Sequence, residues 1–118
     1  GEAVAAGRAL GAGPDGAPRL FVSRIFDAFG EEPVKAFADA VLAVPGRVVA
    51  VADRSDAGFR WLVAHSLGAG LDLGALVKPL LATLGLRGGG RPALVQGAGT
   101  DPAVAGAFVE AVERALRA

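Results

Sequence analysis

The sequence has no cysteine, no methionine and a single histidine, His65, among its 118 residues. The absence of cysteine excludes a disulfide framework and thiol chemistry. With one histidine and no thiolate, a zinc site would consist mostly of carboxylates, which is unlike the sites that zinc prefers. No hydrophobic run is long enough to span a bilayer, so we expect no membrane partner. A chain without methionine even at position 1 is expected to be a fragment of a longer protein.

The chain also lacks an excess of either charge, because 12 basic side chains balance 12 acidic ones. Proteins that bind polyanions through their bulk charge are usually basic overall. Residues 57–99 nevertheless carry four basic side chains against one acid, a net charge of +3. These four are Arg60, Lys78, Arg87 and Arg91. Any anion-binding site is therefore expected to be local and to lie in this stretch.

What is present is a pattern of alternating strands and helices. Residues 1–18 are rich in alanine and glycine and end in turn-forming residues, which predicts a linker or the end of a preceding helix. One domain is expected over residues 19–118. Runs of β-branched and aromatic residues predict strands at 20–26, 47–52, 59–65 and 93–95. Apolar residues at helical spacing predict helices at 31–44, 72–84 and 101–118, with Asp72 and Asp101 capping the starts of the last two and Gly85 ending the second in the left-handed conformation. The order β-α-β-β-α-β-α predicts an α/β protein, or alternatively an α+β one, with helices packed on a small sheet.

No arrangement of catalytic side chains stands out. His65 ends a predicted strand and is expected to be structural, and none of the serines lies in a nucleophile elbow. We expect no catalytic residue and no metal ligand set in this chain. A Walker loop is absent as well, since no glycine is followed by lysine and serine or threonine.

The segment 87–101 differs from the rest because it reads Arg87-Gly88-Gly89-Gly90-Arg91 before an apolar run that ends in Gln96. Three successive glycines lose much backbone entropy on folding. They are predicted to form a loop after the second helix. One hypothesis is that their amides face an anion that the two arginines neutralise. The other is that close packing between elements, or between subunits, requires the glycines. The residues alone leave both hypotheses open.

A resemblance to a known family bears on this segment. The run 87–92 (RGGGRP), the run 96–101 (QGAGTD) and a final amphipathic helix closely resemble the C-terminal DHH-associated domain of alanyl-tRNA synthetases and alanyl-tRNA editing proteins of the AlaX type. Phosphoesterases that share the domain usually have a histidine after the third glycine, where this chain has Arg91-Pro92. The chain departs from the synthetase pattern at Leu94-Val95, where a Met-Ala pair is common, and at Ala98, which replaces a glycine.

The resemblance implies a cytoplasmic parent that is either the synthetase or an editing deacylase. It implies that this domain binds tRNA, in particular tRNA(Ala), and often mediates dimerisation. The chemistry, together with any zinc, ATP or magnesium, belongs to other domains of such a parent, so no cofactor is expected here.

The resemblance and the charge pattern together assign nucleic-acid-binding residues. The candidates are Arg87, Gly88, Gly89, Gly90, Arg91, Gln96 and Gly97, with Lys78 as a possible addition. Two alternatives stay open. The first is a homodimerisation module in which Trp61 or Phe59 anchors the interface from an exposed face of the sheet. The second is the substrate-binding lobe of a DHH-type phosphoesterase.

Overall fold

A mixed sheet forms the middle of the molecule, and the computed structural model describes residues 8–12, 18–67 and 71–117. Within these residues six strands are arranged in the order β1-β2-β3-β4-β6-β5. The strands are β1 (Arg8–Ala12), β2 (Pro18–Asp27), β3 (Arg47–Ser55), β4 (Gly58–His65), β5 (Arg87–Arg91) and β6 (Leu94–Gly99). Strands β2 and β3 run parallel, and the other neighbours pair antiparallel.

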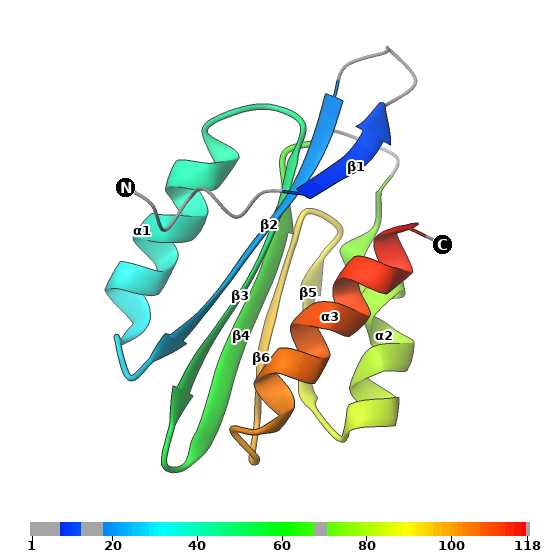
Figure 1. Cartoon of the computed structure of the whole chain (residues 1–118). Helices are drawn as coiled ribbons and strands as arrows, with labels where there is room; N and C mark the ends of the chain where they lie inside the picture. Colours follow the sequence, from blue (N-terminus) through cyan, green and yellow to red (C-terminus); the bar gives the residue numbers. More distant parts are fainter. Residues whose placement is uncertain (1–7, 13–17, 68–70, 118) are drawn as a thin grey trace.

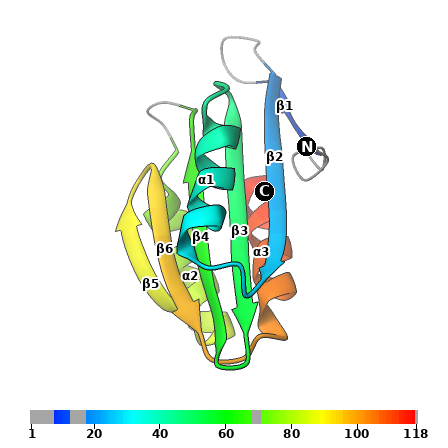
Figure 2. The same ribbon diagram turned by 90° about the vertical axis from the view of Figure 1, so that its left-hand side faces the viewer.

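Helices cover the sheet unequally on its two faces. Helix α1 (Glu31–Leu42) lies on one face, and helices α2 (Leu73–Leu84) and α3 (Val104–Arg117) lie on the other (Figure 1). A parallel pair of strands needs a crossover connection, and α1 supplies it between β2 and β3. In Figure 2, α1 lies in front of the middle of the sheet while β6 and β5 have no helix in front of them. The α1 side of β6 and β5 is therefore open.

The core lies on both sides of β3. Residues 48–52 of this strand are all 0% exposed, as expected for a strand that is covered on both faces. On one side, Phe37 and Val41 of α1 pack against alternate residues of β2 and β3. On the other side, α2 and α3 cover Trp61, whose ring centroid is 4.8 Å from that of Phe108 in α3.

The prediction that Trp61 or Phe59 anchors an interface from an exposed face is wrong. Their side chains are 2% and 3% exposed, because they point to the face of the sheet that α2 and α3 cover. The indole Nε1 of Trp61 is buried and has no hydrogen-bond partner in the described part of the chain. These two side chains therefore belong to the core.

The predicted order of elements is confirmed, with two strands in addition to it. Strand β1 occupies part of the segment predicted as a linker or helix end, and it pairs with β2; residues 1–7 and 13–17 lie outside the described part. Strand β5 occupies the segment predicted as a loop. None of the described helices is long and apolar enough to cross a membrane.

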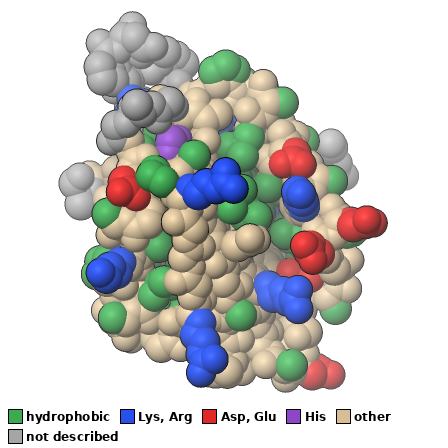
Figure 3. Space-filling model, turned by 180° about the vertical axis from the view of Figure 1, so that it is seen from behind, with side chains coloured by type: hydrophobic (Ala, Val, Ile, Leu, Met, Phe, Trp, Pro, Cys, Tyr) green, Lys and Arg blue, Asp and Glu red, His purple; other side chains and the backbone are tan. Residues whose placement is uncertain are grey.

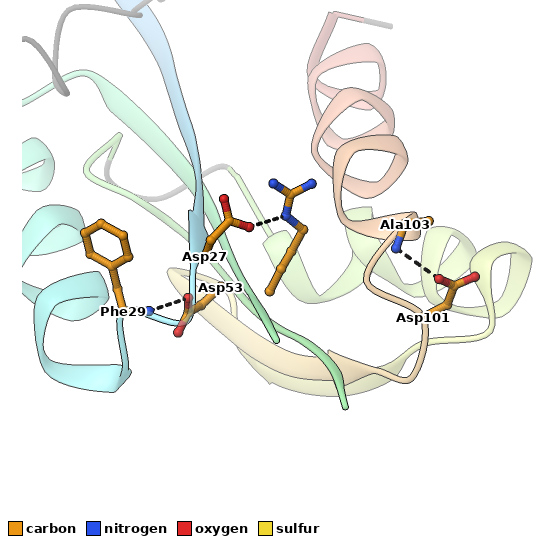
Figure 4. Close-up of polar contacts among 6 residues, drawn as sticks. Asp27, Phe29, Asp53, Asp101 and Ala103 are labelled. Carbon is orange, nitrogen blue, oxygen red and sulfur yellow. Dashed lines mark hydrogen bonds and ion pairs between the residues drawn. The ribbon is translucent and has the colours of Figure 1, made fainter. Parts of the chain in front are cut away.

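The two ends of α2 follow the predicted capping residues. Asp72 accepts a hydrogen bond from the backbone N–H of Ala75 (3.2 Å), and Gly85 ends α2 in the left-handed conformation with φ 69°. Asp101 accepts one from Ala103 (3.0 Å; Figure 4), so a turn precedes α3 and the helix starts at Val104 rather than at 101. Helix α2 continues through Pro79.

Candidate nucleic-acid interface

The triple glycine lies in β5, an edge strand of the sheet, and not in a loop. Each of the five residues of β5 is exposed. One edge of the strand pairs with β6, and no described strand pairs with the other edge. The glycine amides therefore do not form a concave anion-binding loop. They belong to an extended strand. The three successive glycines predicted a loop, but pairing with β6 stabilises the extended conformation.

The register of the sheet decides which candidate residues lie together. Arg87, Gly89 and Arg91 pair with Ala98, Gln96 and Leu94 of β6. These in turn pair with Arg60, Leu62 and Ala64 of β4. Paired residues share a face, and Leu62 and Ala64 pack in the cluster beneath α1. The candidates Arg87, Gly89, Arg91 and Gln96 are therefore on the open α1 side of the sheet, together with Arg60.

A groove of about 540 Å³ lies between α1 and this open part of the sheet; we call it the α1 groove. Its lining residues come from the start of α1, from β3, β4 and β6: Gly30, Glu31, Val34, Lys35, Asp53, Arg60, Trp61, Leu62, Leu94, Gln96, Gly97 and Ala98. Figure 3 shows the molecule from behind, with Lys and Arg side chains around a wide area that carries neither charged nor hydrophobic side chains, and with Asp and Glu side chains gathered to the right of it.

The cations around the α1 groove form no ion pair with an acidic side chain in the described part of the chain. The ion pairs between described residues are Arg54–Asp27 (2.8 Å) and Arg117–Glu113 (2.9 Å), and neither lies at the groove. Within the described residues, no hydrogen bond or ion pair engages the side chains of Lys35, Arg60, Arg87 and Arg91. These four cations can therefore bind an external anion without first breaking an internal contact.

Sequence reasoning did not single out Lys35 and Arg60 as site residues. Arg60 stands between the buried Phe59 and Trp61 in β4. Since neighbouring side chains in a strand point to opposite faces, that alternation was a signal that Arg60 lies on the opposite, open face. Lys35 carried no comparable signal, because an exposed lysine on a helix is usually only solvated.

Three of the candidate glycines serve packing on the opposite face. A Cβ atom on Gly88 or on Gly97 would collide with the indole of Trp61, and one on Gly90 would collide with the carbonyl oxygen of Leu94. Gly88 and Gly90 also have φ values of 151° and 156°, which non-glycine residues rarely adopt. A Cβ on Gly89 would have no atom within 4 Å. Packing thus accounts for Gly88, Gly90 and Gly97, whereas Gly89 has no packing requirement.

Lys78 lies apart from the other candidates. It is exposed on α2, which covers the face of the sheet opposite the α1 groove (Figure 1). A ligand in the groove would not reach it directly. Lys78 therefore offers a natural control for the cations of the groove.

The carboxylate of Asp53 positions the loop that leads into α1. Its Oδ1 accepts a hydrogen bond from the N–H of Phe29 (3.0 Å; Figure 4), and its Oδ2 accepts one from the N–H of Gly30 (2.9 Å). The same loop holds Ala28 at φ 56°, a conformation that costs free energy for a residue with a Cβ. Asp53 therefore holds the first turn of α1, with Glu31 and Lys35, beside the sheet.

Substitution of Asp53 by alanine is expected to lower the free energy of unfolding by about 1–2 kcal/mol, because two hydrogen bonds to a charged acceptor are lost. Urea unfolding monitored by circular dichroism measures this change. Asp39, exposed on α1 without a hydrogen bond to another described side chain, provides the matched control. If Asp39→Ala cost as much as Asp53→Ala, the loss would reflect the removal of a negative charge and not the loss of the loop contacts.

The remaining titratable groups of the described residues do not form a second site. His65 is 8% exposed; its Nδ1 accepts a hydrogen bond from Leu67, and its Nε2 lies 3.0 Å from the carbonyl oxygen of Leu71. This confirms the structural role predicted for it. The hydrogen bond that Arg54 Nε donates to Asp27, and then the negative charge of Asp27, raise the pKa of Arg54. No group of three His, Cys, Asp or Glu residues that could hold a metal occurs in the described residues.

Comparison with known proteins gives consistent matches. The profile of the DHHA1 domain matches residues 18–118. The alanine–tRNA ligase of Corynebacterium jeikeium is 48% identical over 48 residues, which are 41% of this chain and 5% of that protein. The match thus spans only a small part of the ligase. Among solved structures, the C-Ala domain of Aquifex aeolicus alanyl-tRNA synthetase superposes with a TM-score of 0.74 at 19% identity, covering 94% of this chain and 99% of that one. It has the same fold.

Proposed function

The chain belongs to the DHHA1 domain family, and on that basis we propose that it is a non-catalytic tRNA-binding domain of a protein related to alanyl-tRNA synthetase. The observation that carries the proposal is a set of four cations on one side of the sheet that form no ion pair with a described residue: Lys35, Arg60, Arg87 and Arg91. A basic surface on one face is the usual electrostatic footprint of a nucleic-acid-binding protein.

The shape of this surface supports RNA as the ligand. Gly89 has no side chain, and Ala98 has a short one, so a phosphate backbone can approach the sheet closely. Arg87 and Arg91, at the two ends of β5, can each present a guanidinium fork to a phosphate. RNA of folded shape is recognised mainly through its backbone and 2′-hydroxyls. The interface proposed here accordingly reads shape and phosphate position.

The ligase from Corynebacterium jeikeium and the Aquifex domain support a parent that acts on tRNA. We propose that this parent is the cytoplasmic synthetase or an editing deacylase, that the tRNA is tRNA(Ala), and that the parent's chemistry lies in other domains. Dimerisation through Phe59 or Trp61 is not proposed, because both side chains are buried.

The proposal is tested by titrating a tRNA(Ala) transcript with the 118-residue chain over a series of salt concentrations. Four phosphate contacts predict a slope of log K against log[salt] of about −3 to −4. The double variant Arg87→Ala/Arg91→Ala is expected to reduce this slope by about 2 and to weaken binding at low salt at least about tenfold.

Lys78→Ala removes a cation on the opposite face and is the matched control, with unchanged affinity and slope expected. Binding that does not respond to salt, or a double variant that binds as tightly as the unmodified chain, would contradict the proposed interface. Equal losses from Lys78→Ala and from a single arginine variant would point to net charge instead of a defined surface.

A further inference from the structure

Acidic side chains line the α1 groove together with the cations Lys35 and Arg60. Two carboxylates line the groove, Glu31 and Asp53. Asp53 is occupied by the N–H groups of Phe29 and Gly30. Glu31 makes no hydrogen bond or ion pair with another described residue. The groove therefore contains a carboxylate whose acceptor oxygens are available to a ligand.

An available carboxylate weakens the binding of phosphate, because like charges repel. A surface that serves only to attract RNA would be improved by its loss. Stabilisation of the α1 dipole by an acid in the first turn is a structural role for Glu31, but Glu32 is in the same turn and is not among the groove residues. The position of Glu31 in the groove thus calls for a ligand group that donates hydrogen bonds.

The rest of the groove fits the flat face of a nucleobase. Val34, Leu62, Leu94 and Ala98 provide an apolar lining, and Leu94 is 38% exposed. Unstacked bases in RNA loops are commonly bound on apolar surfaces and recognised along their Watson–Crick edges. The volume of about 540 Å³ is within the range of small-ligand sites, so a base with its sugar can be accommodated.

Resting on the proposed function, we propose that the α1 groove binds an unstacked guanine of the RNA and that Glu31 accepts hydrogen bonds from its N1–H and N2–H groups. Guanine alone among the four bases has two adjacent donors along the Watson–Crick edge, which match the two oxygens of a carboxylate. The donor amines of adenine and cytosine stand beside a ring acceptor, and the single N–H of uracil stands between two carbonyl oxygens. Each of these acceptors repels a carboxylate.

The test is a titration of the 118-residue chain with 5′-monophosphates, followed through the amide NMR signals of the groove residues. GMP is expected to bind about tenfold more tightly than AMP, CMP or UMP, as for a bidentate base contact. Inosine 5′-monophosphate, which lacks the N2 amine, is expected to bind more weakly than GMP. In Glu31→Gln these preferences are expected to disappear, while Glu32→Gln retains them.

The tRNA titration distinguishes failure of this inference from failure of the proposed function. Glu31→Gln is expected to bind the tRNA(Ala) transcript with an unchanged salt slope. If the chain bound the transcript but all five nucleotides equally, or if Glu31→Gln kept the guanine preference, the inference would be overturned and the function would stand. If the transcript did not bind, the proposed function would fail, and the nucleotide titration would still decide whether the groove selects guanine.

Discussion

Alanine in place of Gly88 is expected to lower the free energy of unfolding by about 2–4 kcal/mol, because the added Cβ overpacks the core and the residue keeps a positive φ. Its methyl group would meet the indole of Trp61 and the backbone of Gly97. Both obstacles lie on the buried side of β5, and neither is the end of a flexible side chain. Urea unfolding followed by far-UV circular dichroism measures the change.

Gly89→Ala, one residue further along the same strand, is the matched control. Nothing lies within 4 Å of its added Cβ, so the free energy of unfolding is expected to change by less than about 0.5 kcal/mol. The methyl group would instead stand on the side of the sheet proposed to bind RNA, between Arg87 and Arg91, and weaken tRNA binding. Equal destabilisation by the two substitutions would contradict the conclusion that Gly88 is required for packing and Gly89 is not.

Alanine in place of Trp61 is expected to cost about 3–5 kcal/mol, as for the truncation of a buried aromatic side chain. The indole fills the space between β4, the glycines of β5 and β6, and Phe108 of α3. Its loss leaves a cavity that the extended strands around it cannot easily close. Thermal and urea unfolding both measure this loss.

The comparison with Trp61→Phe separates volume from polarity. Phenylalanine keeps most of the aromatic contact and removes the indole N–H, which has no partner among the described residues, so its cost is expected to be well below that of alanine. In the Trp61→Phe variant, Gly88→Ala should also lower the free energy of unfolding by less than it does in the unmodified chain. The coupling free energy between the two substitutions is expected to be on the order of 0.5–3 kcal/mol. A cost below about 0.5 kcal/mol for Trp61→Ala would mean that the side chain is on the surface.

Local patterns were sufficient for most of the fold. The β-branched run of β3, the 3.6-residue spacing in α1 and the caps Asp72 and Gly85 each act within a few neighbouring residues, so the sequence alone predicts them. Strands β1 and β5 could not be predicted in this way. Both are rich in glycine or alanine and have little intrinsic preference for a strand, and each becomes extended only through pairing with a neighbour.

Only part of the candidate site was predicted, because its other residues come together through strand pairing and helix packing. Charge and composition identified Arg87, Arg91 and Gln96, but only the register of β5 on β6 shows that they share a face with Gly89 and not with Gly88. The register of β6 on β4 then brings in Arg60. Lys35 and Glu31 belong to the site because α1 packs on the sheet. The local sequence pattern does not predict that packing.

The position of Trp61 also gives the chain an intrinsic fluorescence probe beside the α1 groove. It is the sole tryptophan of the protein, and only the backbone of Gly97 and Gly88 separates its ring from the opposite face of the sheet. Its fluorescence emission consequently originates within one strand thickness of any nucleotide held there. Occupancy of the groove and loss of the fold can thus be followed in the same cuvette, without an attached dye.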